Sequence, residues 1–298
     1  SSDLEQVPRL QSLLNADGIE CEIIHAVDAL QQRVASAASG GEIVVVAAGG
    51  DGTVSLAAAT TNKVAGSVVP IVPMPLGTEN LLARHFGHAA AAESVVQTIR
   101  RGSLCELDAG TANGKLFLIM ATCGFDAEVV RGMHLTRSGH IRRHSYAGPI
   151  LRAIRRYKFP KMRITLDDDE AIECCWAMVF NLPRYGGGLK IEPDAEGDDG
   201  RLNVIAFQHG SIASGLKYVA GIWSRRHLGF QDVVRRQASK IEIVSDSRVP
   251  FQLDGDYAGR LPLRIEANPR HVRLLLPPVE RRSLAQRSGK RRRDERGR

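Results

Sequence analysis

Acidic residues stand among glycines at three places in the chain, where they could take part in phosphate chemistry. They are Gly49-Gly50-Asp51-Gly52-Thr53, the "EGDDGRL" stretch from Glu196 to Leu202, and Asp254-Gly255-Asp256. The flanking sequence is most informative for the first of these, Gly49 to Thr53. The apolar run "IVVVAA" before it predicts a strand buried on both faces. The Ala-rich segment after it predicts a helix with Thr53 at the N-cap. A glycine-rich turn at such a junction presents backbone N–H groups to an anion, most often phosphate.

Asp51 is the unusual residue in this turn. A carboxylate that faces a phosphate is repelled unless a cation or a reacting proton lies between the two groups. A second turn, Leu76-Gly77-Thr78, leads into a predicted helix near Glu79, and its Thr78 hydroxyl could also contact phosphate. The two turns together predict a phosphate site that uses a metal or transfers a proton.

The order of predicted elements divides the chain into two domains. Residues 1–105 alternate helices and strands, including a strand over 19–24, which predicts an α/β domain with an open parallel sheet and ligands at the carboxyl ends of its strands. Residues 106–278 are rich in strand patterns, with helices near 146–157 and 212–226, and predict an antiparallel β-sandwich. We expect residues 279–298 to form a basic disordered tail.

The composition indicates a folded protein without a transmembrane segment or a secretory signal. The 298 residues are 43% hydrophobic and 24% charged, which fits two folded domains. No apolar run approaches the ~20 residues of a membrane span, and no secretory signal is visible. The five cysteines show no CxxC spacing, so we expect reduced thiols in a cytoplasmic protein.

Positive charge is concentrated in two segments of this chain of net charge +7. Residues 131–163 hold ten Lys or Arg and no acid, and residues 280–298 hold nine basic against three acidic residues. Basic patches attract lipid head groups or nucleic acid. We expect the first segment, with Arg142, Arg143, Arg155 and Arg156, to bind an anionic membrane surface peripherally; the alternative is a solvated helix face.

Five motifs resemble the diacylglycerol kinase catalytic-domain family, which includes bacterial lipid kinases and sphingosine kinases and shares a fold with NAD kinases. They are "GGDGT", "PLGTENLLAR", "CGFDAEVV", "NLPRYGGGLKIEPDAEGDDGRLNV" and "FQLDGDYAGRLPLRI", in the family's order and approximate spacing. The resemblance implies an ATP- and Mg²⁺-dependent kinase that phosphorylates a hydroxyl of a membrane lipid such as diacylglycerol or a sphingoid lipid. It implies no specific nucleic-acid partner and leaves a homodimer open.

The resemblance also implies roles for individual residues. Those expected to bind ATP are Gly49, Gly50, Asp51, Gly52, Thr53, Thr78 and Asn80. Asp51 would hold catalytic Mg²⁺ or orient the nucleotide, and Asp256 would be the general base for the attacking hydroxyl. A structural Mg²⁺ would take the carboxylate of Asp199 and the carbonyls of Glu196 and Arg201, although an ordinary turn would also explain this loop.

Three departures from the family pattern leave other functions open. Val54-Ser55-Leu56 replaces the usual Leu-Asn-Glu, Glu79 replaces a glycine, and the chain begins past the family's first strand and Asn-Pro turn. We therefore expect an upstream segment that the sequence lacks. The alternatives are a catalytically weak relative that binds lipid or nucleotide, and a soluble small-molecule kinase similar to NAD kinase.

Overall fold

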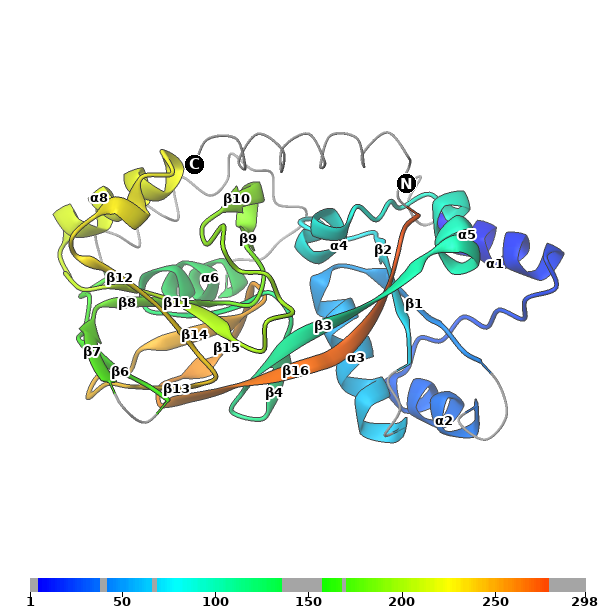
Figure 1. The fold of residues 1–298 in the computed structure, drawn as a ribbon, viewed down its shortest axis with the longest axis horizontal. Coiled ribbons are helices and arrows are strands. Elements are labelled where there is room, and N and C mark those ends of the chain that lie inside the picture. Colours follow the sequence, from blue (N-terminus) through cyan, green and yellow to red (C-terminus); the bar gives the residue numbers. More distant parts are fainter. Residues whose placement is uncertain (1–4, 38–41, 66–68, 136–156, 168–169, 279–298) are drawn as a thin grey trace, which may run out of the picture.

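The computed structural model describes residues 5–37, 42–65, 69–135, 157–167 and 170–278. These residues form two lobes, which one long strand joins (Figure 1). The predicted helix over 146–157 lies outside the described residues except for Tyr157. Arg142, Arg143, Arg155 and Arg156 of the basic segment and the tail from 279 also lie outside them. No helix in the described ranges is both long and apolar enough to cross a bilayer.

The N-terminal lobe is a small sheet covered by helices on both faces. Its elements are α1 (Gln6–Ala16), α2 (Val27–Ala37), β1 (Val45–Gly49), α3 (Asp51–Ala65), β2 (Ile71–Pro75), α4 (Leu81–Phe86) and α5 (Ala92–Arg101). Strands β1 and β2 pair in parallel. Successive β2 residues face opposite cores: Ile71 packs with Val54 and Ala58 of α3, whereas Val72 packs with Leu10 and Val95 of α1 and α5. Burial on both faces explains the continuous apolar run of β2. The same expectation is wrong for β1, in which Ala47 is buried but Ala48 is exposed and the other residues are partly buried.

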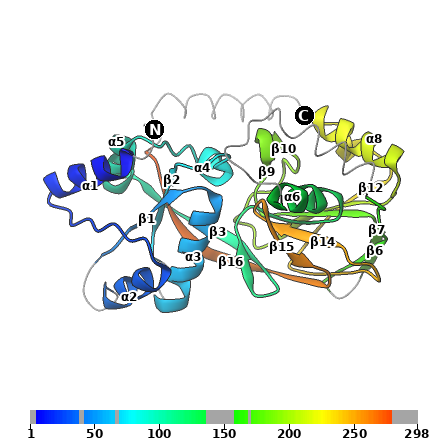
Figure 2. The same ribbon diagram turned by 180° about the vertical axis from the view of Figure 1, so that it is seen from behind.

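Strand β16 (Leu263–Leu276) belongs to both lobes (Figure 2). Its end pairs in parallel with β2 through Leu274 and Ile71. Most of its length pairs antiparallel with β3 (Ser103–Ala112), with an irregularity between Asn268 and Val272. The chain therefore returns to the first lobe after building the second, and the expected open parallel sheet is a mixed sheet that keeps its parallel strands at one end.

The C-terminal lobe is the antiparallel β-sandwich that the sequence predicts. One layer continues from β16 through β13 (Lys240–Val244), β6 (Met162–Leu166) and β7 (Glu170–Cys174), with β4 (Lys115–Phe117) beside β3. The other layer, in spatial order, is β12 (Val233–Ala238), β11 (Leu202–Phe207), β8 (Trp176–Phe180), β5 (Met120–Cys123), β14 (Pro250–Leu253) and β15 (Asp256–Arg260). Small and branched side chains such as Val179, Ile164 and Ile241 fill the space between the layers.

Helices cover the outer face of the six-stranded layer. They are α6 (Phe125–Leu135) and α8 (Ile212–Trp223), and the short elements β9 (Arg184–Tyr185), η2 (Gly186–Gly188), β10 (Leu189–Lys190) and η3 (His227–Gly229) lie in the same lobe. Phe125 of α6 packs at right angles on Trp176, which stacks on Phe207 with ring centroids 4.5 Å apart. Tyr218 of α8 packs on the same Phe207. The alternating side chains of β8 and β11 thus serve two cores.

The strand expected over 19–24 is wrong, because these residues belong to no strand of the described structure. Ile19 and Ile23 each remain 37% exposed. Residues 19–24 alternate apolar and acidic side chains, which indicates the side that a strand would bury. A strand also needs a neighbouring strand to pair with, and the alternation does not provide one.

Gly110 of β3 provides a test of the sandwich. It lies directly opposite Phe117 of β4, and a Cβ at this position would lie 2.0 Å from the Phe117 ring. We expect Gly110→Ala to lower the free energy of unfolding by about 1–3 kcal/mol, because the buried ring has to move. Chemical denaturation measures this change. Gly186→Ala, at a site with open space and no positive φ, is the matched control and should stay near wild type.

Candidate functional site

The Asp51 carboxylate joins the two phosphate-loop candidates. Asp51 begins α3, and its two oxygens accept hydrogen bonds from the backbone N–H groups of Leu81 and Leu82, at 2.8 and 2.9 Å. These are orphan amides at the start of α4, so the carboxylate caps a helix that is 30 residues further along the chain. Burial raises the pKa of Asp51, and the two amide donors act in the opposite direction.

The two turns also touch through their backbones. A Cβ on Gly77 would lie 2.6 Å from the Cα of Gly50, so no larger residue fits at position 77 without displacing the other loop. The buried Asn80 side chain holds Gly77 from both sides: its Oδ1 accepts from Gly77 N–H, and its Nδ2 donates to Gly77 C=O. Asn80 itself adopts a left-handed conformation, with φ of 50°.

The glycine turn leaves the start of α3 accessible. Thr53 is exposed, and its hydroxyl occupies the place that a Gly49 side chain would take, 2.2 Å from an added Cβ. Thr78 is also exposed, at the tip of the second turn. The structure thus brings together all seven residues expected to bind ATP: Gly49, Gly50, Asp51, Gly52, Thr53, Thr78 and Asn80.

The late acidic motif is a two-residue hairpin turn. Asp254 and Gly255 connect β14 to β15 and have φ of 49° and 95°, the pair of positive values that defines a type I′ turn. Gly255 N–H donates to the side chain of Gln252 at 2.7 Å. The Asp-Gly pair is therefore the ordinary sequence signal of a hairpin, and its chemistry depends on what the turn faces.

Asp254 is the most constrained side chain at this turn. Its Oδ1 accepts from the N–H groups of Ile119 and Met120, and its Oδ2 from that of Leu118, at 2.8 to 3.0 Å. Oδ2 also accepts from the Ser55 hydroxyl of α3 at 3.0 Å, a bond between the two lobes. Burial raises the pKa of Asp254 to about 6, although the three amides and Ser55 lower it.

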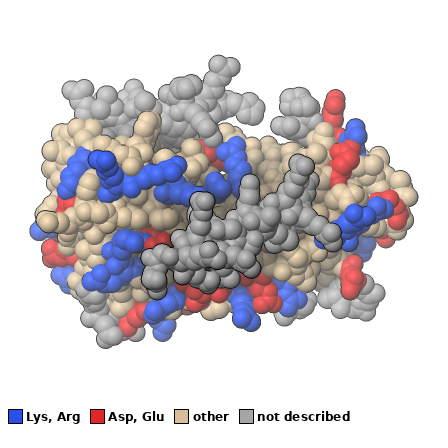
Figure 3. Space-filling view, turned by 45° about the horizontal axis from the view of Figure 1, so that its top comes forward, with Lys and Arg blue, Asp and Glu red and all other residues tan. Residues whose placement is uncertain are grey.

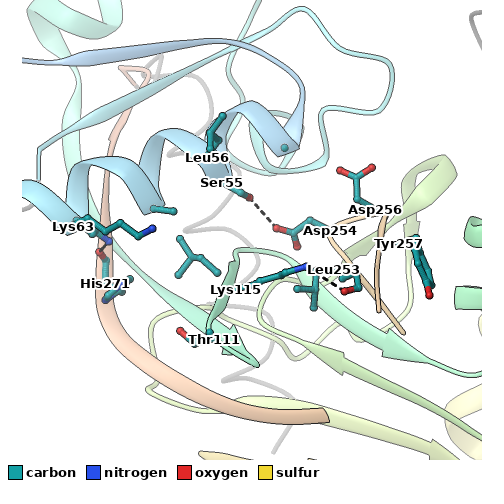
Figure 4. A pocket seen from close by; sticks show the side chains of 16 residues that line it. Ser55, Leu56, Lys63, Thr111, Lys115, Leu253, Asp254, Asp256, Tyr257 and His271 are labelled. Carbon is teal, nitrogen blue, oxygen red and sulfur yellow. Dashed lines mark hydrogen bonds between the residues drawn. The ribbon is translucent and has the colours of Figure 1, made fainter. Parts of the chain in front are cut away.

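Asp256 faces the glycine turn across a cleft. A Cβ placed on Gly52 would lie 3.5 Å from Asp256 Oδ2, so a glycine at this position keeps the space between them open. The cleft has a volume of about 620 Å³. Its walls are α3, the β3–β4 hairpin, the β14–β15 hairpin and His271 of β16 (Figure 4). Lys63 and Lys115 lie in opposite walls, and two ammonium groups favour an anionic ligand.

A buried network supports the hairpin from behind. Asp126, which is 6% exposed, accepts hydrogen bonds from Thr122, from Trp176 Nε1 at 2.7 Å and from the Tyr185 hydroxyl at 3.0 Å. Thr122 accepts in turn from the Gln252 amide at 2.8 Å, and Gln252 holds Gly255. Hydrogen bonds therefore run without a break from the core of the second lobe to the turn between the two acids.

The predicted magnesium loop lies elsewhere. Glu196, Asp199 and Arg201 are exposed and do not line the cleft. Asp199 Oδ1 accepts from the Arg201 N–H at 3.0 Å, as in an ordinary Asx turn. A buried carboxylate anchors the loop: Asp108 accepts from the N–H groups of Gly200 and Arg270, both at 2.6 Å. Within the described ranges, no three His, Cys, Asp or Glu side chains cluster as a metal site would need.

Sequence reasoning missed several residues that build this site. Asp254 stands in the motif from which only Asp256 was chosen, and Ser55 was noted solely as a departure from the family pattern. Asp126 was also missed, and Asp108 and Lys115 carry no local signal, because their roles depend on partners that are distant in sequence. A buried acid in an apolar stretch, such as Asp126 in "CGFDAEVV", was the available clue.

Comparison with known proteins finds one matching family model for each lobe. Residues 2–112 match the diacylglycerol kinase catalytic domain, and residues 120–276 match the YegS C-terminal NAD kinase beta sandwich-like domain. The diacylglycerol kinase of Mycobacterium tuberculosis strain H37Rv is 32% identical over 238 residues, covering 76% of this chain and 74% of the relative. That of Bacillus subtilis is 23% identical, covering 73% and 75%.

A solved diacylglycerol kinase structure from Bacillus anthracis strain Sterne shares the fold. It aligns with a TM-score of 0.59 at 18% identity, covering 87% of this chain and 85% of the other.

Gln252→Leu tests the supporting network. We expect turnover of the enzyme to fall by roughly tenfold or more, because Gly255 N–H and the Thr122 hydroxyl lose a partner and the turn that holds both acids loosens. Stability should fall by about 1–3 kcal/mol, the cost of unsatisfied buried groups. Steady-state kinetics and denaturation on the same samples measure both. Gln237→Leu, at an exposed position whose amide donates to Asp199, is the matched control. Unchanged turnover in a destabilised Gln252→Leu protein would mean that the network is structural alone.

Proposed function

The chain belongs to the diacylglycerol kinase catalytic-domain family, a family of lipid kinases, and from this we propose that it transfers the γ-phosphoryl group of ATP to the free hydroxyl of diacylglycerol. The relatives named above are diacylglycerol kinases, which favours this lipid over a sphingoid substrate. The same relatives favour a lipid kinase over a soluble kinase similar to NAD kinase.

The observation that carries this proposal is the position of Asp256 opposite Gly52. Phosphoryl transfer requires an acceptor hydroxyl between a base and the phosphate, with little covalent work by the protein. Asp256 stands on one wall of the cleft, and the start of α3 stands on the other. A lipid hydroxyl bound between them would donate its proton to Asp256 as its oxygen attacks phosphorus.

The glycine turn suits the phosphates of ATP. Without side chains at Gly50 and Gly52, the phosphates can approach the first amides of α3, and Thr53 and Thr78 add hydroxyl donors. Lys115 and Lys63 would offset the charge of the triphosphate. The Lys115 ammonium donates to the Ala258 carbonyl at 3.2 Å, which holds it in the cleft wall.

The acids near the turn also fit a magnesium ion. Mg²⁺ prefers carboxylate, phosphate and water oxygens. Asp51 is the carboxylate within the turn itself, and each of its oxygens keeps a lone pair beyond the amide bond that it accepts. We propose that Asp51 both caps α4 and helps to hold the ion, which would neutralise phosphate charge. The second ion, at Glu196, Asp199 and Arg201, stays a prediction from the resemblance alone.

The residues after the glycine turn that differ from the family pattern, Val54 to Leu56, are compatible with the proposed site. Leu56, which stands where the family has an acid, is 50% exposed in the cleft wall. Its neighbour Ser55 bonds Asp254 and so connects α3 to the hairpin that carries Asp256. An assembled acid pair supports an active enzyme over a catalytically weak relative.

Asp256→Asn tests the base. We expect kcat to fall by roughly 10²- to 10⁴-fold, the usual contribution of a general base, with little change in ATP affinity. Radiolabelled ATP with a dispersed short-chain diacylglycerol gives the rate, and equilibrium ATP titration gives the affinity. Asp246→Asn, an exposed acid outside the cleft, is the control. Weakened ATP binding at unchanged kcat would instead place Asp256 on the metal or the nucleotide.

A second prediction concerns pH. Burial raises the pKa of Asp254 to about 6, and its carboxylate form accepts four hydrogen bonds at the turn. We expect kcat to fall as the pH drops through this value, because protonation removes acceptor capacity. The Ser55 hydroxyl lowers this pKa, so Ser55→Ala should raise it and move the acid limb to higher pH.

The measurement is kcat from pH 5 to 8 for both proteins. Ser245→Ala, which removes an exposed hydroxyl bonded to the Lys161 carbonyl, should leave the profile unchanged. An acid limb at the same pH in Ser55→Ala would argue against Asp254 as the titrating group.

A further inference from the structure

Helix α8 has an apolar side that no part of the described lobe covers. Its inner side packs on the sandwich through Tyr218 and Ile222, which are 1% and 6% exposed. Its outer side carries Ile212, Leu216 and Trp223, which are 49%, 47% and 73% exposed. A surface helix of a globular protein is normally apolar only on the side that faces the core. Apolar residues on the outer side of α8 therefore indicate a contact with another partner.

The outer residues form one continuous stripe. Positions 212, 216 and 223 recur at helical spacing and lie within a narrow sector of the helix surface. Ala213 and Ala220, both exposed, extend the sector without adding polar groups. Lys217 is the one charged residue among the twelve of α8, and its ammonium group bonds Asp232 at the edge of the helix.

The charge around the stripe is positive. From Arg201 to Gln231 the sequence contains no acidic residue. Arg225 and Arg226 follow directly after the helix, and both are exposed. Figure 3 shows Lys and Arg side chains in a band on the side of the molecule that carries α8 in Figure 1, with few acidic side chains among them.

We infer that the outer face of α8, with Arg225 and Arg226, docks on an anionic lipid bilayer. An exposed tryptophan and aliphatic side chains flanked by arginines match the interface, where apolar groups enter the acyl boundary and cations meet lipid phosphates. A stripe on one twelve-residue helix is small for a protein partner, which takes roughly 800 Å² per side. This inference rests on the proposed function, because diacylglycerol resides in the bilayer.

The docking surface would hold the chain at the bilayer in which diacylglycerol resides. No residue of α8 lines the cleft, which lies between the two lobes, so adsorption through α8 leaves the cleft free to bind ATP. The inference places a membrane contact on α8, Arg225 and Arg226. The sequence had suggested only the basic segment 131–163.

Two tryptophans make the experiment direct. Trp176 is 4% exposed and bonds Asp126, so its surroundings should not change on vesicle binding. Trp223 lies in the proposed contact. We expect the fluorescence of the full chain to shift to the blue with phosphatidylglycerol vesicles, and not with phosphatidylcholine vesicles. Added salt should reverse the shift, because it screens the arginines.

Variants separate the stripe from the charges. Leu216→Gln with Trp223→Gln, and Arg225→Glu with Arg226→Glu, should each weaken co-sedimentation with phosphatidylglycerol vesicles by roughly tenfold or more. Leu104→Gln and Arg101→Glu, exposed positions on β3 and α5 at the far end of the molecule, are the matched controls and should bind like wild type.

Activity distinguishes this inference from the proposed function. The α8 variants should lose activity on diacylglycerol in vesicles and keep it on a dispersed short-chain diacylglycerol. Wild-type binding by both variants overturns the docking surface, whatever the activity. Conversion of a dimer to a monomer by Leu216→Gln and Trp223→Gln in size-exclusion chromatography would also overturn it, since α8 would then pair with a second copy. Vesicle binding through α8 without phosphorylation of either lipid would support the surface and contradict the kinase proposal.

Discussion

The Asp254 carboxylate is the interaction on which the site depends. It sits at the tip of a hairpin of the second lobe, accepts three backbone N–H bonds that lead into β5, and accepts a fourth bond from Ser55 in the first lobe. An acid that is partly removed from water is costly unless its oxygens accept hydrogen bonds, and here those bonds fix the position of α3 relative to the β14–β15 hairpin. The adjacent Asp256 is thereby brought opposite the glycine turn. One carboxylate thus connects the two lobes at the cleft.

The other polar contacts repeat this arrangement elsewhere in the fold. Asp51 caps α4, Asp108 anchors the loop around Gly200, and Asp126 supports Gln252 and the hairpin turn. In each case a carboxylate accepts bonds from groups in other elements, so it rigidifies a junction and adds little apolar burial. Strand β16 supplies the complementary constraint, because it hydrogen-bonds to strands of both lobes. Lobes joined by a shared strand can hold acids and amides at fixed separations across the cleft, as phosphoryl transfer requires.

The proposed chemistry and the proposed membrane contact lie on different parts of the molecule. The hairpin acids face the first lobe, whereas α8 presents Leu216 and Trp223 on the outside. The sandwich connects them: Phe207 of β11 packs under Tyr218 of α8, and Trp176 beside it bonds Asp126 of the supporting network. These contacts join α8 and the network that supports the hairpin in one packed lobe.

The sequence alone determined the two-domain order, the glycine turn and the acidic hairpin. These are local signals: an apolar run, a glycine cluster before a helix, and an Asp-Gly pair each follow from the backbone chemistry of a few residues. It could not show that β16 pairs with strands of both lobes, or that residues 19–24 lack a partner strand. It also could not show that Asp254 holds the hairpin in place while Asp256 faces the glycine turn. Nor could it show that both Asp51 oxygens accept hydrogen bonds from the start of α4, or that α8 is apolar on a side that the rest of the described lobe leaves uncovered. Tertiary structure decided these points, because pairing, capping and burial depend on residues that lie far apart in the sequence and meet only in the fold.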